Sequence, residues 1–255
     1  MLRDHWVAGY SYAHRGLHTG EMPENTLPAF ENAIRHGFGI ELDVQLSGDG
    51  EVVVFHDREV FRLTGKEGCV SAYTAAELGK MPVGGTVHTI PALKEVLALV
   101  GGRVPLLIET KNAGGAGALE QALYKQMQGY SGAWAVQSFS PFSIGWFKRH
   151  AQNIPRGQLS SAFRDGADGT PGYKLFFVRR LLTNFLCRPN FISYEHMDLQ
   201  NGTVQRLREN GIPVLAWTVR TEKEAAQAKM LADNIIFEGF LPIDEGETEF
   251  GSEEE

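Results

Sequence analysis

Seven ionisable residues lie at or just beyond the ends of short apolar runs, where strands of a sheet would gather them. They are His14, Arg15, Glu41, Asp43, His56, Glu109 and Lys111. In segment 41–43, the alternation of a strand puts both carboxylates on one face, and Glu109 ends a second apolar run. Acids on the inward face of a buried strand are costly without a compensating cation, and hard oxygen ligands suit Mg²⁺ or Ca²⁺. Internal salt bridges with Arg15 and Lys111 are the competing interpretation.

Two histidines are expected beside these acids. The apolar run 7–13 predicts a buried strand that ends at His14. The turn 47–50 predicts a hairpin, and a turn centred between its middle residues would pair His56 with Glu41. Paired residues of a hairpin share a face, although a slip of one residue would turn His56 away. Phosphodiester hydrolysis needs one group to accept a proton and another to donate one, and histidine does both near neutral pH.

The elements that must position these residues alternate between strand and helix along the chain. Strands are predicted at 10–14, 40–46, 105–108, 133–139, 156–160, 191–194, 214–219 and 234–238, with a hairpin arm at 52–55. An eightfold βα alternation is typical of the α/β class and of the (β/α)8 TIM barrel, which carries catalytic groups at the carboxyl ends of its strands. We expect one barrel domain over residues 1–243, with a small cap insertion at about 57–88 after the hairpin.

The formal net charge of −7 comes from the end of the chain. Residues 244–255 hold seven acids and no Lys or Arg, and the rest has 24 basic and 24 acidic residues. We therefore expect an acidic disordered tail, a neutral folded body and no nucleic-acid partner. Two cysteines make no disulfide framework, and no signal peptide or membrane span is evident, so a cytoplasmic location is the default expectation. Nothing in the sequence indicates the oligomeric state.

One apolar segment, 174–187, carries interspersed cations. It could lie on a membrane surface or gate the site. A barrel helix with its apolar face on the sheet is the favoured interpretation.

The ordered series of motifs resembles the glycerophosphodiester phosphodiesterase family, within the phospholipase C-like phosphodiesterase superfamily. The motifs are His14-Arg15-Gly16, Pro23-Glu24-Asn25-Thr26, Glu41-Leu42-Asp43-Val44, Ser47-Gly48-Asp49-Gly50, His56-Asp57, Ile90-Pro91-Ala92-Leu93, Glu109-Thr110-Lys111, Ser138-Phe139 and Ala216-Trp217-Thr218-Val219. Each motif alone is weakly specific, but their order over residues 12–242 is specific.

The resemblance implies a role for each residue nominated above. His14 and His56 would be the acid–base pair. Glu41, Asp43 and Glu109 would hold one divalent cation, Mg²⁺ or Ca²⁺, and Arg15 and Lys111 would contact the phosphate or the carboxylates. The insertion would cap the site and help to hold a glycerol moiety.

Three further positions are given more modest expectations. Trp217 and Phe139 are candidate walls of the pocket, and ordinary core packing is the alternative for both. Asn25 is expected to do no more than cap a helix.

Two positions depart from the family pattern. Segment 237–242 (Phe-Glu-Gly-Phe-Leu-Pro) stands where Thr-Asp usually precedes the closing Pro, and Arg220 replaces an Asn. Neither change touches the predicted metal or acid–base residues. We therefore expect both to affect substrate preference and to leave the reaction unchanged.

The implied function is metal-dependent hydrolysis of small-molecule glycerophosphodiesters to sn-glycerol 3-phosphate and an alcohol. The nucleophile is either water or the neighbouring hydroxyl of the glycerol. A lysophospholipase D acting on a lipid shares the same residues and is the alternative enzyme. A catalytically silent barrel that binds phosphodiesters is the alternative from another class.

Overall fold

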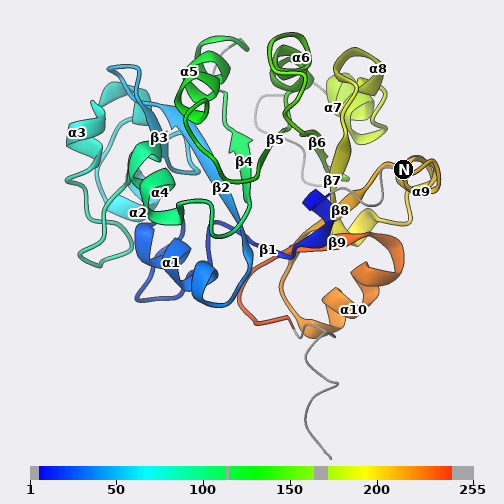
Figure 1. Cartoon of the computed structure of the whole chain (residues 1–255), viewed down its shortest axis with the longest axis horizontal. Coiled ribbons are helices and arrows are strands. Elements are labelled where there is room, and N and C mark those ends of the chain that lie inside the picture. The colour runs from blue at the N-terminus through cyan, green and yellow to red at the C-terminus, as the bar shows by residue number, and fades with distance from the viewer. Residues whose placement is uncertain (1–5, 113–114, 164–171, 243–255) are drawn as a thin grey trace, which may run out of the picture.

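Eight parallel strands close into a barrel in the computed structural model of the chain, which describes residues 6–112, 115–163 and 172–242 (Figure 1). The barrel strands are β1 (Tyr12–Ala13), β2 (Gly39–Leu46), β4 (Leu106–Thr110), β5 (Trp134–Ser138), β6 (Arg156–Ser160), β7 (Phe191–Glu195), β8 (Val214–Val219) and β9 (Asn234–Phe237). Strand β1 pairs in parallel with both β2 and β9, which closes the ring. The predicted TIM barrel is confirmed.

Helices surround the ring of strands (Figure 1). The outer helices are α1 (Leu27–Arg35), α4 (Leu93–Val100), α5 (Ala118–Met127), α6 (Pro141–His150), α7 (Gly172–Arg179), α8 (Asn184–Cys187), α9 (Gly202–Glu209) and α10 (Glu222–Leu231). Helix α1 begins after Thr26 with a proline in its first turn, and Phe30 and Ala33 are buried against the sheet. Gly37 follows its end at φ 72°, as expected of a helix stop.

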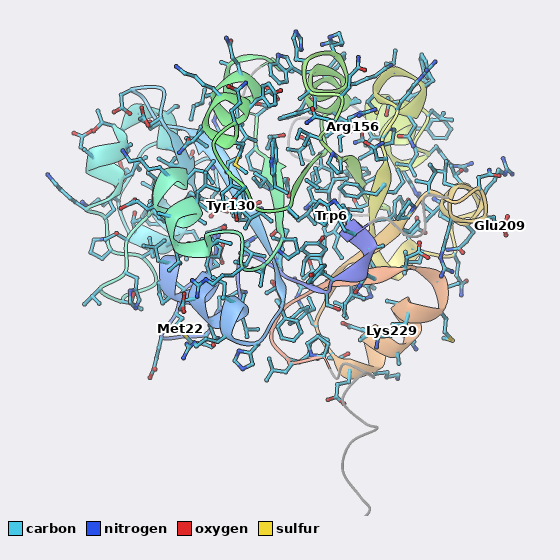
Figure 2. The ribbon with its side chains drawn as sticks, viewed as in Figure 1. Trp6, Met22, Tyr130, Arg156, Glu209 and Lys229 are labelled. Carbon is cyan, nitrogen blue, oxygen red and sulfur yellow. The ribbon has the colours of Figure 1, made fainter. Side chains whose placement is uncertain are left out.

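The apolar run 7–13 forms a strand only at its end. Trp6–Gly9 is a 3₁₀ helix, η1, so the predicted strand is wrong over its first half. Val7 is buried with inward-facing residues of the barrel, and Figure 2 shows Trp6 over the middle of the ring. The run is therefore apolar because it closes the amino-terminal end of the barrel, a burial that sequence alone does not distinguish from that of a strand.

The hairpin register differs by one residue from the predicted one. Strand β3 (Val52–Val54) is antiparallel to β2 and pairs Val54 with Val44, which would turn His56 away from Glu41. However, β3 ends at Val54 and the chain leaves the ladder. The Gln45 amide then donates hydrogen bonds to the carbonyls of Phe55, His56 and Asp57, and this bend carries His56 to the site.

The insertion 57–88 packs on the outer hairpin. It contains α2 (Phe61–Thr64), η2 (Val70–Ala72) and α3 (Ala75–Leu78). Outside the insertion, a further 3₁₀ turn, η3 (His196–Asp198), follows β7. The apolar residues of the insertion form a core cluster of their own with Val53 and Phe55 of the hairpin arm. The expected acidic tail, 244–255, lies outside the described residues. No described helix is both long and apolar enough to cross a bilayer.

Candidate active site

A pocket of about 170 Å³ opens among residues at or beyond the carboxyl ends of the barrel strands. Its lining comprises His14, Arg15, Glu41, His56, Glu109, Lys111, Gln137, Phe139, Leu159, Trp217, Thr218, Arg220 and Ile236. Eight of the nine predicted site residues are among them, and the ninth, Asp43, is fully buried beside Glu41 and Glu109. The structure thus brings all nine together.

Three carboxylates come from two neighbouring strands. Glu41 and Asp43 lie on β2, and Asp43 is the register partner of Glu109 on β4. Parallel pairing places these inward-facing residues side by side, and one oxygen of each lies within 4.8 Å of the others. All three are buried. Their spacing and chemistry suit a divalent cation with oxygen ligands.

Lysine and arginine compensate part of this charge. Lys111 Nζ lies 2.5 Å from Glu109 Oε1 and 3.2 Å from Asp43 Oδ1, and Arg15 Nε lies 3.4 Å from Asp43 Oδ2. Burial alone would raise the pKa of Asp43, but Lys111, His56 and Arg15 outweigh it and hold that pKa below its usual range. The predicted salt bridges are therefore present.

Glu41 has no cationic side chain as a partner among the described residues. Its oxygens accept hydrogen bonds from the Arg15 backbone N–H and from Gln137 Nε2, at 3.0 and 3.3 Å. Burial, followed by the charges of Asp43 and Glu109, raises the pKa of Glu41 well above its ordinary value. Asp43 Oδ1 also receives no well-oriented hydrogen bond despite its ion pair. The positive charge of Lys111 and Arg15 therefore does not balance the three carboxylates, and a bound divalent cation would make up the difference.

Asn25 does not cap the helix as predicted: the N-cap position of α1 is Thr26, whose side chain makes no capping hydrogen bond. The amide nitrogen of Asn25 donates to Asp43 Oδ2 at 2.8 Å, and its amide oxygen accepts from the Asp43 backbone N–H. Asn25 is buried at φ 57°, a left-handed conformation that asparagine tolerates better than most residues. Asn25 thereby fixes the orientation of the Asp43 carboxylate.

His14 is held by a carboxylate that the sequence analysis did not assign. Its Nδ1 lies 2.5 Å from Glu238 Oε2, and Arg220 Nε lies 2.7 Å from the other Glu238 oxygen. Burial lowers the pKa of His14, and the hydrogen bond to Glu238 opposes that shift. Of the two departures from the family pattern, Glu238 contacts His14 directly and Arg220 contacts Glu238. The expectation that neither change touches the predicted acid–base residues is therefore wrong for Glu238.

His56 is held in the same way, by its neighbour in the chain. Its Nδ1 lies 2.6 Å from Asp57 Oδ1, and Asp57 also pairs with Arg62 of the insertion. Arg62 in turn pairs with Glu24, which pairs with Arg15 at 2.7 Å. This chain of ion pairs joins the insertion to the loop after β1.

Gly16 allows that loop to turn. It lies at φ 80°, and a Cβ there would come within 2.9 Å of Ala29 and Phe30 in α1. Any other residue would push the loop, and with it Arg15, away from the helix.

Aromatic side chains form one wall of the pocket. Phe139 and Trp217 meet edge to face, with ring centroids 5.6 Å apart, and Phe163 lies 6.0 Å from Phe139. The predicted position of Phe139 and Trp217 on the pocket wall is thus observed. Phe163 packs against Phe139 from outside the pocket lining, and it was not predicted because it follows β6 without a surrounding motif.

Comparisons with known proteins agree with this geometry. A model of the glycerophosphoryl diester phosphodiesterase family matches residues 14–238. YhdW of Bacillus subtilis is 30% identical over 237 residues, which cover 89% of the chain and 93% of YhdW. A glycerophosphodiester phosphodiesterase of Caldanaerobacter subterraneus is also 30% identical over 237 residues, 88% of the chain and 91% of that protein. A solved phosphodiesterase of Oleispira antarctica, in complex with the product sn-glycerol-3-phosphate, has a TM-score of 0.74 and 26% identity, and the match covers 90% of this chain and 92% of that one.

Proposed function

Because the chain belongs to the glycerophosphoryl diester phosphodiesterase family, whose members are phosphoric diester hydrolases, we propose a specific reaction for it. It cleaves glycerophosphodiesters into sn-glycerol 3-phosphate and an alcohol, with one divalent cation and two histidines. The observation that carries this proposal is the convergence of His14, His56 and the three buried carboxylates on one pocket. The solved relative with bound sn-glycerol-3-phosphate supports the product.

The two histidines move the protons. His14 takes a proton from the nucleophile, which is water or the neighbouring hydroxyl of the glycerol. Attack by that hydroxyl forms a cyclic phosphate, which water must then open to give glycerol 3-phosphate, and each route needs a base at this place. The Glu238 carboxylate accepts a hydrogen bond from Nδ1–H and leaves Nε2 of His14 as the basic nitrogen. His56, fixed in the same way by Asp57, gives a proton to the leaving alkoxide as the bond between phosphorus and oxygen breaks.

Positive charge binds the phosphate. Glu41, Asp43 and Glu109 would hold the divalent cation, which when bound neutralises charge that develops on the phosphoryl oxygens. Burial would lower the pKa of Lys111, but Asp43 and Glu109 raise it above its usual value, so the ammonium stays charged beside the pocket. Arg15 offers a guanidinium at the same wall.

The substrate assignment is tested by comparing glycerophosphocholine, glycerophosphoethanolamine and lysophosphatidylcholine with Mg²⁺ and with Ca²⁺. We expect release of glycerol 3-phosphate from the first two. The small pocket, about 170 Å³, is suited to the glycerophosphate half of such substrates. Faster cleavage of the lysolipid would replace this assignment with a lysophospholipase D. Failure to cleave any of them with either metal would favour a phosphodiester-binding barrel.

Glu238→Gln should lower kcat by about 10–100-fold, the cost typical of removing a carboxylate that orients a metal-bound histidine, because Glu238 fixes the His14 ring and its tautomer in the same way. The carboxylate raises the pKa of His14, so its loss lowers that pKa further. His14 must be neutral to act as a base, and the acidic limb of the kcat/KM profile should therefore move to lower pH. The measurement is the pH–rate profile of the variant beside that of the parent.

Two further variants separate positioning from general damage. Glu238→Asp keeps the negative charge. It should recover part of the rate, and the acidic limb of its kcat/KM profile should lie close to that of the parent. His18→Asn removes a group 3.7 Å from Glu238 while leaving the contact with His14, and should change the profile little. A reduced rate with an unmoved acidic limb in Glu238→Gln would mean that Glu238 is only structural.

A further inference from the structure

Helices α7 and α8 expose large apolar side chains. Among them are Phe176, Phe177, Leu182, Phe185 and Leu186, which are between 45% and 73% exposed and which we call the α7–α8 apolar surface. In the segment 174–187, only Leu181 and Cys187 of the described apolar side chains are buried. The interpretation of this segment as a helix with its apolar face on the sheet is therefore wrong for most of its length.

The same part of the chain is strongly basic. Residues 121–194 contain nine Lys and Arg and two acids, whereas the rest of the chain contains 15 basic and 29 acidic residues. Both acids lie outside the described residues. The exposed cations include Arg149 on α6 and Arg179, Arg180 and Arg188 around the apolar side chains. The overall neutrality of the body thus conceals a cationic side.

Hydrogen bonds fix this surface to the barrel. Lys148 of α6 donates to the Leu186 carbonyl at 2.7 Å, and the buried Arg156 donates to the carbonyls of Cys187 and Arg188 at the end of α8. Figure 1 shows α6, α7 and α8 side by side, and Figure 2 labels Arg156 next to them. The exposed side chains therefore lie on helices that these hydrogen bonds anchor to the barrel.

The α7 part of the surface lies toward the carboxyl ends of the strands, the end at which the pocket opens. The end of α7 is tied to the carboxyl ends of two strands, because Ser160 Oγ of β6 donates to the Val178 carbonyl and the Tyr194 hydroxyl of β7 donates to the Arg179 carbonyl. Phe142, at the start of α6 beyond β5, is 69% exposed and extends the apolar character along the same end of the barrel.

We propose that the α7–α8 apolar surface docks the enzyme on a bilayer that contains anionic phospholipid. Aromatic and aliphatic side chains would enter the boundary between headgroups and acyl chains, and the arginines around them would meet the lipid phosphates. Arg180 lies over the Phe176 ring, 5.5 Å from its centroid, so cation and aromatic ring are presented together. This interaction goes beyond the proposed hydrolysis, which needs no membrane.

Charge argues against a second copy of the chain as the occupant. A twofold dimer places the same surface on both partners, so these arginines would face arginines. A negatively charged lipid surface complements them.

The test is flotation of the full chain with vesicles of phosphatidylcholine alone and of phosphatidylcholine with phosphatidylglycerol. We expect binding to the anionic vesicles that weakens in high salt. Arg149→Glu with Arg180→Glu should reduce it at least tenfold, since each cation near an anionic bilayer contributes about fivefold. Phe176→Ser with Phe185→Ser should reduce it as well, and both variants should retain turnover of glycerophosphocholine, which also shows that they fold.

Matched controls lie on α10, away from this surface. Met230→Ser removes an apolar side chain that is 70% exposed, and Lys223→Glu reverses an exposed cation. Both should bind vesicles as the parent does. The proposal is overturned by absent binding to anionic vesicles, by equal losses in the α10 controls, or by a parent dimer in sedimentation velocity that Phe185→Ser dissociates.

Discussion

We expect His14→Ala to lower kcat by about 10²–10⁴-fold, because general acid–base catalysis by a side chain typically contributes that much to the rate. KM should change much less, since the imidazole acts on the proton of the nucleophile while Arg15 and Lys111 remain at the pocket wall. His56→Ala should lower kcat by a similar factor, because His56 is proposed to donate the proton to the leaving alkoxide. Steady-state kinetics with glycerophosphocholine at saturating metal measures both losses.

The double variant and a third histidine sharpen this prediction. If His14 and His56 act in one reaction, removing both should cost far less than the product of the single losses. His18→Ala is the matched control, because His18 also approaches Glu238 but does not line the pocket. Near-normal turnover in either single variant would remove that histidine from the mechanism.

Chelation of divalent cations should abolish turnover, with a loss of at least about 10²-fold, because cation stabilisation of transition-state charge is worth several kcal/mol. Added Mg²⁺ or Ca²⁺ should restore it. A binding readout accompanies the kinetics. A cation at 100 times its Kd stabilises the folded state by about 2.7 kcal/mol, so the Tm of the chelated protein should rise when the metal is added.

Glu41→Gln is the variant that connects this rise to the site. It should lose turnover and the Tm gain from metal, yet raise the Tm of the metal-free protein by removing a repelled carboxylate. The pKa of Glu41 is raised in the folded state, so its protonated form favours folding at low pH, and that contribution is lost as pH rises through the folded pKa. The metal-free parent should therefore lose more Tm above the ordinary carboxyl range than Glu41→Gln does. An unchanged Tm gain in the variant would place the metal elsewhere.

Local patterns predicted the barrel well because each strand is a short apolar run between turn or helix signals. All eight barrel strands lie within two residues of the predicted bounds. Only the longer apolar run 7–13 misled at its start, because η1 is equally apolar but fills the end of the barrel. The hairpin register failed by one residue because turn type depends on backbone angles that the residues 47–50 do not fix alone.

Most of the candidate site was also predictable, since metal ligands and histidines are rare residue types at strand ends. The supporting residues were not. Glu238 meets His14 only where the first and last strands pair, 224 positions apart, and Asn25 reaches Asp43 only through a left-handed backbone. The net charge of the folded body did not predict the basic surface, because the excess of basic residues in 121–194 is cancelled in the sum by an excess of acidic residues elsewhere.

Closure of the barrel between β1 and β9 has a consequence for the timing of synthesis. His14 lies at the end of the first strand, and its backbone N–H donates to the Phe237 carbonyl at the end of the last one. The ribosome therefore makes Glu41, Asp43, Glu109 and both histidines early, whereas Glu238, which contacts His14, is made only after the final strand. Under the proposed mechanism, a chain that ends before β9 would hold the predicted metal ligands without the carboxylate that fixes His14.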